Sequence, residues 1–141
     1  MLPLLAFVFA ATPLQATSQH ADPSIEAQID ELESEIPKKR RLAAMSLRRL
    51  TKKYTRVADR EHGDEVQIME ARQALMVFDD ELTRTCIQQL AVQNLTGLCA
   101  DILGLLGSEK AEAPLESQLQ REDRRGVARR IEKALEAIRT P

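Results

Sequence analysis

The hydrophobic positions after residue 24 recur at intervals of three and four, the spacing of one face of an α-helix. Between Leu95 and Ile138 this spacing predicts three consecutive helices. The first is expected to stop at Gly107, the second to be capped by Ser108, and the third to be capped by Asp123. Each of these helices is too short to be stable alone in water, so the pattern also predicts that they pack on one another.

The earlier part of the chain shows the same periodicity. Ile25, Ile29 and Leu32 predict a short helix, and Pro37 begins a second one that runs to about Arg60. Asp64 can cap a third helix, and Asn94 is expected to cap the helix that follows Leu95.

The Asp79-Asp80 pair leaves two interpretations of the middle of the chain. Either a helix ends there and a separate one follows, or the apolar stripe from Ile68 to Leu82 belongs to one long helix, since it keeps helical phase across the two aspartates. The second interpretation would make a long helical hairpin, followed by one or two helix pairs.

Four leucines suggest an internal repeat. Leu47, Leu75, Leu103 and Leu135 are separated by 28, 28 and 32 residues, within the range of two-helix repeats. We therefore expect an all-α fold, a short α-solenoid of three to four antiparallel helix pairs. The last helix would then pack its apolar face inward and present its arginines as the polar outer face of the end unit.

The segment from Ala100 to Asp123 resembles the HEAT-like repeats of the phycobilisome-lyase type. In that family a helix ending A-x-A-L-G-x-L-G is followed by one reading A-x-x-P-L-x-x-x-L-x-x-E-D, and Ile102 departs from the pattern by replacing an alanine. The matching residues are Leu103, Gly104, Leu106, Gly107, Ala111, Pro114, Leu115, Leu119, Glu122 and Asp123. The resemblance is strongest over residues 95–138, and it implies that 24–141 is a HEAT-like repeat domain. It also implies a binding scaffold whose contact surface is lined by the second helix of each pair.

The first 16 residues have the layout of a secretory signal peptide. Leu2 to Ala11 is an almost unbroken apolar run, followed by Pro13 and small residues ending at Ala16. A membrane-spanning helix needs about 20 apolar residues, so a permanent anchor fits this segment less well. We therefore predict a cleaved signal peptide over 1–16, a disordered leader over 17–23, export to the periplasm or the extracellular space, and no stable membrane anchor.

Composition and charge narrow the classes of function. The 141 residues suffice for one domain, and 3% aromatic residues with no Trp favour an all-helical fold. A formal net charge of −2 gives no overall attraction to nucleic acid or membranes, so any electrostatic role must come from a local cluster.

Such a cluster exists, because half of the 20 basic residues lie between Lys38 and Arg60. We expect the acidic stretch from Glu26 to Glu35 to neutralise the first of them, Lys38 to Arg41. The candidate interaction surface consists of Arg41, Arg48, Arg49, Lys52, Lys53, Arg56 and Arg60.

The sequence contains no set of residues that indicates catalysis, a cofactor or a metal. His62 beside a helix end is explained as a solvated terminus, and two Cys with two His are too few for a usual zinc site. Cys86 and Cys99 flank a turn symmetrically and form a candidate disulfide; the alternative is two buried thiols. Asn94 begins an N-glycosylation sequon, which we interpret as a helix cap.

These observations predict an exported, non-enzymatic scaffold that binds a protein partner, with no cofactor and no sequence-specific recognition of nucleic acid. The alternative is a cytosolic helical protein that binds nucleic acid or another polyanion through the basic helix 38–60.

Overall fold

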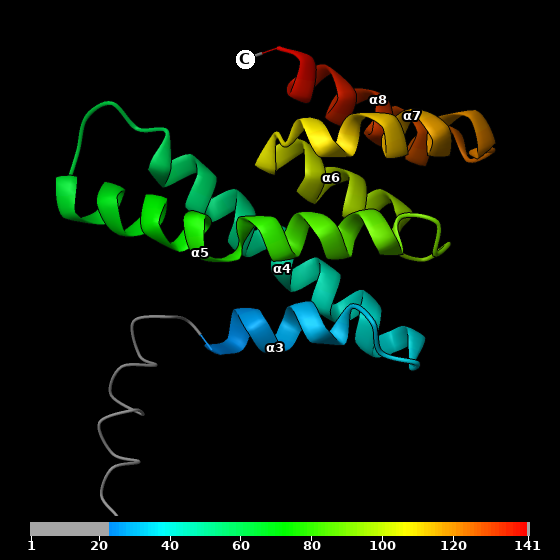
Figure 1. Cartoon of the computed structure of the whole chain (residues 1–141), viewed down its shortest axis with the longest axis horizontal. Coiled ribbons are helices and arrows are strands. Elements are labelled where there is room, and N and C mark those ends of the chain that lie inside the picture. The colour runs from blue at the N-terminus through cyan, green and yellow to red at the C-terminus, as the bar shows by residue number, and fades with distance from the viewer. Residues whose placement is uncertain (1–22, 141) are drawn as a thin grey trace, which may run out of the picture.

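The computed structural model describes residues 23–140, and these residues are helical with no strand (Figure 1). The all-α prediction is therefore confirmed for this part of the chain. The predicted signal peptide over 1–16 and residues 17–22 of the predicted leader lie outside the described residues, and the last leader residue, Pro23, is the first residue of a helix. The helices are α3 (Pro23–Glu31), α4 (Pro37–Ala58), α5 (Glu65–Gln89), α6 (Thr96–Leu106), the 3-10 turn η1 (Glu109–Ala111), α7 (Glu112–Arg121) and α8 (Arg125–Arg139).

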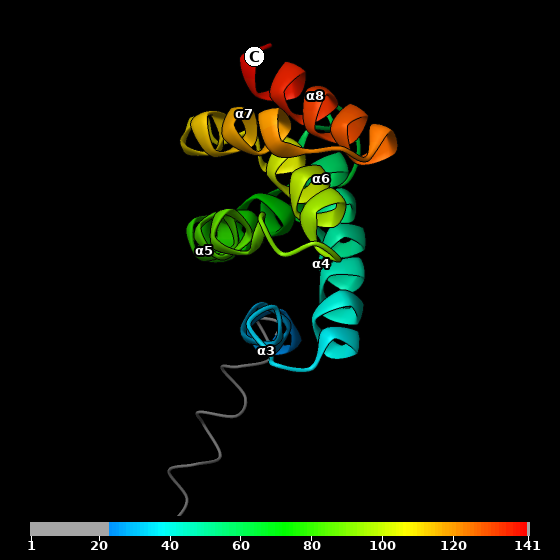
Figure 2. The same cartoon turned by 90° about the vertical axis from the view of Figure 1, so that its right-hand side faces the viewer.

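The helices pack on their neighbours along the chain. Helix α3 contacts α4, α4 contacts α5, α5 contacts α6, and α7 contacts α8. Further contacts from α4 to α6 and from α6 to α8 join these three helices into one layer. Figure 2 shows α3, α5 and α7 above one another along one side of the molecule, with α4 and α6 beside them.

The middle of the chain forms one long hairpin instead of extra helices. Helix α5 runs unbroken through 25 residues, so of the two interpretations of Asp79-Asp80 the continuous helix is correct and a separate helix does not form there. The Thr83 hydroxyl donates a hydrogen bond to the Asp79 carboxylate one turn earlier, which accommodates this aspartate inside the helix. Leu75 is consequently only half-buried in a first helix, whereas Leu47, Leu103 and Leu135 are buried in α4, α6 and α8. The four leucines therefore do not occupy equivalent positions, and Leu75 does not mark a separate unit.

Two expected helix ends are confirmed. Gly107 adopts a left-handed conformation with φ of 70° after α6, and the Asp64 carboxylate accepts a hydrogen bond of 2.9 Å from the backbone N–H of Val66. The expected end of the second helix near Arg60 was too late, because α4 stops at Ala58.

Asn94 and Asp123 do not cap helices as expected. The N-cap positions of α6 and α8 are Leu95 and Arg124, neither with a side-chain cap. The Asn94 amide instead donates to the backbone carbonyl of Pro37, which ties the loop before α6 to the start of α4.

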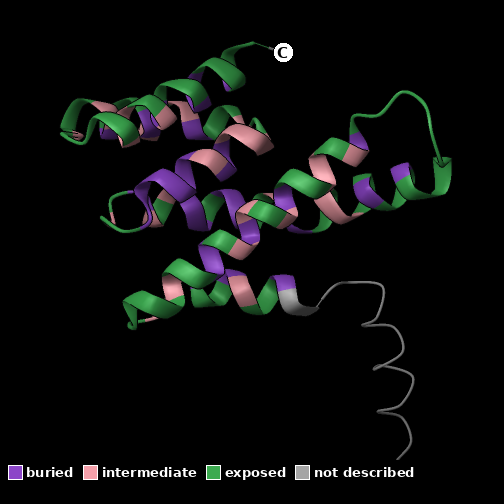
Figure 3. Cartoon of the chain, turned by 180° about the vertical axis from the view of Figure 1, so that it is seen from behind, coloured by how far each residue is buried: buried purple, intermediate pink, exposed green. Residues whose placement is uncertain are grey.

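Helix α6 lies at the centre of the core. Seven of its 11 residues are buried: Thr96, Gly97, Leu98, Cys99, Ala100, Ile102 and Leu103. Figure 3 shows the buried residues gathered in the middle of the molecule. Helix α8 approaches α6 closely at Gly104, where an added Cβ atom would lie 2.9 Å from the Cα of Ala134.

This contact predicts opposite effects for two glycine substitutions. Gly104→Ala should lower the free energy of unfolding by about 1–3 kcal/mol, because the new methyl group meets the backbone of α8 and the helices must separate. Gly126→Ala is the matched control in α8: a Cβ there meets nothing within 4 Å, so it should raise stability by about 0.5–1 kcal/mol. Urea titrations of both variants test this, and equal effects at the two sites would contradict the packing.

Candidate functional site

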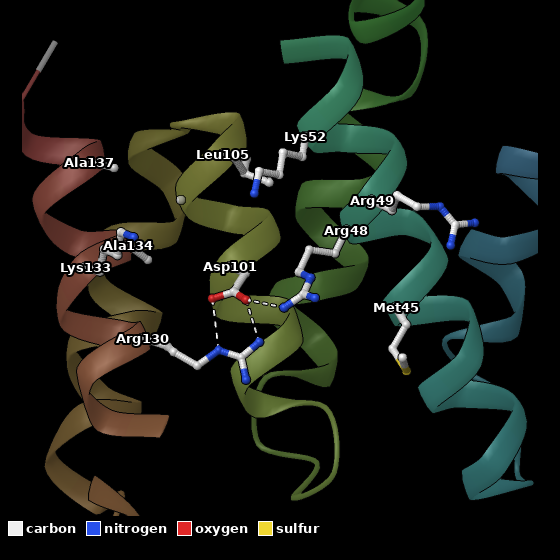
Figure 4. Close-up of a pocket in the computed structure, with 11 residues that line it drawn as sticks. Met45, Arg48, Arg49, Lys52, Asp101, Leu105, Arg130, Lys133, Ala134 and Ala137 are labelled. Atoms are coloured by element: carbon white, nitrogen blue, oxygen red, sulfur yellow. Dashed lines mark hydrogen bonds and ion pairs between the residues drawn. The ribbon is translucent and has the colours of Figure 1, made fainter. Parts of the chain in front are cut away.

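Asp101 is the only charged residue of α6, and two arginines bind it from opposite sides. Arg48 of α4 donates through Nη1 to Oδ2 at 3.0 Å. Arg130 of α8 donates through Nε to Oδ1 at 3.1 Å and through Nη2 to Oδ2. Figure 4 shows the carboxylate between the two guanidinium groups. A charged residue on the central helix is thus paired by both neighbouring helices of the same layer.

Gly97 makes room for one of these arginines. A Cβ atom at this position would lie 2.7 Å from Nη1 of Arg130, so the guanidinium passes directly over the glycine. The bare backbone of α6 therefore lets Arg130 lie flat against the helix and reach Asp101 with two nitrogens.

The three residues lie in a groove between α4 and α8, with α6 as its floor. The groove has a volume of about 610 Å³. Its charged lining consists of Arg48, Arg49, Lys52, Arg130 and Lys133, against the single carboxylate of Asp101. Figure 4 shows Arg49 pointing away from Asp101, so it belongs to the rim. The groove is strongly cationic even without Arg49.

The cationic surface continues towards the start of α8. A second hollow of about 390 Å³ shares Arg48 and Arg130 with the groove and adds Arg41 and Arg124. Hydrogen bonds from Arg124 hold the pKa of Glu122 below its usual range. Arg124 is therefore matched by its own counter-ion, which leaves Arg41 as the main additional charge.

Apolar side chains lie among these cations. Met45 lines both hollows and is 42% exposed, and Leu105 and Ala137 line the larger one. Leu42, on the same helix as Met45, is 55% exposed. The lining residues include no aromatic side chain. A ligand of this surface would therefore meet both positive charge and apolar contact area, with no ring for bases to stack on.

The structure separates the basic residues singled out from the sequence into two groups. Arg41, Arg48, Arg49 and Lys52 border the groove or its extension, whereas Lys53, Arg56 and Arg60 line neither. Sequence reasoning missed the residues that α6 and α8 supply, namely Asp101, Arg130 and Lys133. A lone aspartate in an otherwise apolar helix was the available signal, because such a charge requires a partner.

The expected neutralisation of Lys38 to Arg41 by the acidic stretch of α3 is not observed. Within residues 23–140 no ion pair joins the two helices. Arg40 donates to the backbone carbonyl of Ser34, and the ion pair of α4 is directed to Asp101. Within residues 23–140, Arg48 is therefore the one basic residue of α4 that forms an ion pair.

Other classes of site receive no support from the described residues. Residues 23–140 contain no group of three His, Cys, Asp or Glu side chains placed to hold a metal ion, and His62 is exposed in the loop between α4 and α5. No helix in this range has the length and apolar character needed to cross a membrane. No protein-family model, curated protein or solved structure matches this chain.

Cys86 of α5 and Cys99 of α6 meet inside the core. Both are fully buried and are free thiols in the structure. A hydrogen bond with Cys99, together with burial, raises the pKa of Cys86 well above its usual value. The two cysteines are therefore neighbours in the core, and the disulfide between them stays a prediction.

In protein recovered from an oxidising compartment we expect Cys86 and Cys99 to be bridged, because both thiols are buried in the same core and closing so short a loop adds about 3 kcal/mol. Mass spectrometry after unfolding in urea without reductant should show a mass two hydrogens lighter and no alkylation by iodoacetamide. The same sample treated with reductant is the control and should take up two alkyl groups. Two alkylated thiols without reductant would reject the bridge.

Proposed function

We propose that this chain is a non-enzymatic binding module that holds an acidic segment of a partner protein in the groove between α4 and α8. The excess of positive charge around the groove carries the proposal: Arg48, Lys52, Arg130 and Lys133 face a single carboxylate. A carboxylate-rich ligand would find charge-assisted hydrogen-bond donors on both walls.

The mixed lining favours a protein over a nucleic acid as the ligand. Met45 and Leu105 offer apolar area that a phosphate backbone cannot use, whereas an amphipathic acidic segment covers it. The only tyrosine, Tyr54, packs against Phe78 with ring centroids 5.9 Å apart and does not line the groove. Binding of nucleic acid through α4, the alternative raised by the sequence, would therefore rest on phosphate contacts alone.

We further propose that α3 with α4, α5 with α6, and α7 with α8 are the three helix pairs of a short HEAT-like solenoid. Its support is the order of the pairs and the resemblance of residues 95–138 to HEAT-like repeats. In such repeats the second helix of each pair lines the contact surface, and the groove is built from α4, α6 and α8, the second helices here. A groove on this face agrees with a role as a scaffold.

The proposed function predicts that a peptide of glutamate and leucine binds the protein and that binding weakens as salt is raised. Replacing Lys52 and Lys133 together by Gln should weaken binding about fivefold or more at low salt, because both ammonium groups line the groove. Fluorescence anisotropy with the labelled peptide measures both effects.

The matched control replaces Lys38 and Lys53 by Gln, which removes the same charge from exposed positions outside the groove. This pair should change the affinity by less than about twofold. Absence of peptide binding, or equal losses from the two double variants, would overturn the proposal. Single-stranded DNA of equal charge that binds more tightly than the peptide, and loses affinity with the groove pair, would establish the nucleic-acid alternative.

We also propose that the protein is exported, on the basis of the signal-like first 16 residues. Expression of the full chain with its natural amino terminus should then give a mature protein that starts at or near Thr17. Amino-terminal sequencing measures this directly. A soluble cytosolic pool that retains Met1 would contradict export and leave the binding proposal standing.

A further inference from the structure

The centre of the groove already holds a bound carboxylate, that of the protein's own Asp101. Two arginines from different helices contact its two oxygens, Arg48 at Oδ2 and Arg130 at both. This is the arrangement in which a carboxylate of an acidic ligand would be recognised.

We infer that Arg48 and Arg130 form a carboxylate-binding subsite of the groove and that the carboxylate of Asp101 competes with the ligand for this subsite. The inference rests on the proposed function, because it names the position in the groove where an acidic ligand is held. An arriving carboxylate shares the two guanidinium groups with Asp101 or takes its place. The affinity of the groove for acidic ligands is thereby kept below the value that its arginines alone would give.

The geometry leaves the arginines open to such a ligand. A guanidinium group carries five N–H donors, and Asp101 receives one of them from Arg48 and two from Arg130. The side chains of Arg48 and Arg130 are 43% and 37% exposed, whereas that of Asp101 is 25% exposed. The donors therefore reach the groove more readily than the carboxylate that occupies them.

The surrounding charge also favours an exchange of carboxylates. Lys52 and Lys133 line the same groove, and within residues 23–140 neither forms an ion pair. Asp101 offsets only part of this positive charge, so a second carboxylate still enters an attractive field. Removing the charge of Asp101 should strengthen that field at the point where the ligand binds.

The purely structural alternative assigns Asp101 no effect on ligands. On that view the two arginines only neutralise a charge on the central helix, and substitution of Asp101 changes stability alone. The two views predict different affinities for a variant without this carboxylate. The affinity is unchanged on the structural view and higher if Asp101 competes with the ligand.

The experiment compares Asp101→Asn with the unaltered protein in binding the labelled peptide of glutamate and leucine. We expect the variant to bind about three- to tenfold more tightly at low salt, because one nearby repulsive charge is gone and two guanidinium groups are freed. The gain should shrink as salt is raised. Asp80→Asn is the matched control: it makes the same change in net charge at an exposed position of α5 outside the groove, and should alter the affinity by less than about twofold.

A second measurement uses the unaltered protein and needs no folded variant. In an NMR titration with the peptide, the Nε–Hε resonance of Arg130 should shift, because this group donates to Asp101 in the free protein. The Nε–Hε resonance of Arg139, which donates to Glu112 between α8 and α7, should stay in place.

The outcomes separate the inference from the function on which it rests. No peptide binding by the unaltered protein would overturn the proposed function. Normal binding, with an Asp101→Asn variant that binds equally or more weakly than the Asp80→Asn control, would overturn the competitor role alone. An unshifted Arg130 resonance at saturating peptide would also overturn the competitor role, since the ligand would then not contact the arginine pair.

Discussion

The burial of α6 is the constraint on which the rest of the structure depends. Eleven residues make too short a helix to persist in water, so α6 is stabilised by the helices around it. It contacts α4, α5 and α8, and seven of its residues have lost their access to solvent. The close approach of Gly104 to Ala134 brings α8 against it, while α4 packs on another side. The positions of these two helices define the groove.

The carboxylate of Asp101 links this packing to the candidate site. A charge on the helix that forms the core needs counter-charges, and the layer arrangement supplies them from both sides, Arg48 and Arg130. The same ion pairs join both walls of the groove, α4 and α8, to its floor, α6. In the proposed function, a ligand that engages the two arginines would also act on a contact between helices.

Only some of the basic residues of α4 line the groove. The cations of α4 lie all around the helix, because nine of them occur within its 22 residues. Packing on α5 and α6 covers the apolar stripe and leaves Arg48 and Lys52 facing α8, whereas Lys53, Arg56 and Arg60 face elsewhere. The charges supplied by α8, which the sequence suggested only as a polar outer face of the end unit, complete the groove on the other side.

The sequence by itself determined the features that depend on neighbours a few residues apart. The apolar spacing predicted the helices, Gly107 and Asp64 marked two of their boundaries, and Cys86 and Cys99 were placed at the same level. Tertiary structure decided what those patterns left open. The aspartates at 79 and 80 fit both a break and a continuous helix, and a cation on a helix surface fits both a solvated face and one wall of a site. Asn94 likewise bonds to Pro37, 57 residues earlier, in place of its own helix. Local periodicity fixes which face of a helix is apolar, but it carries no information on which helix will cover that face, and Arg48, Asp101 and Arg130 become a site only through that choice.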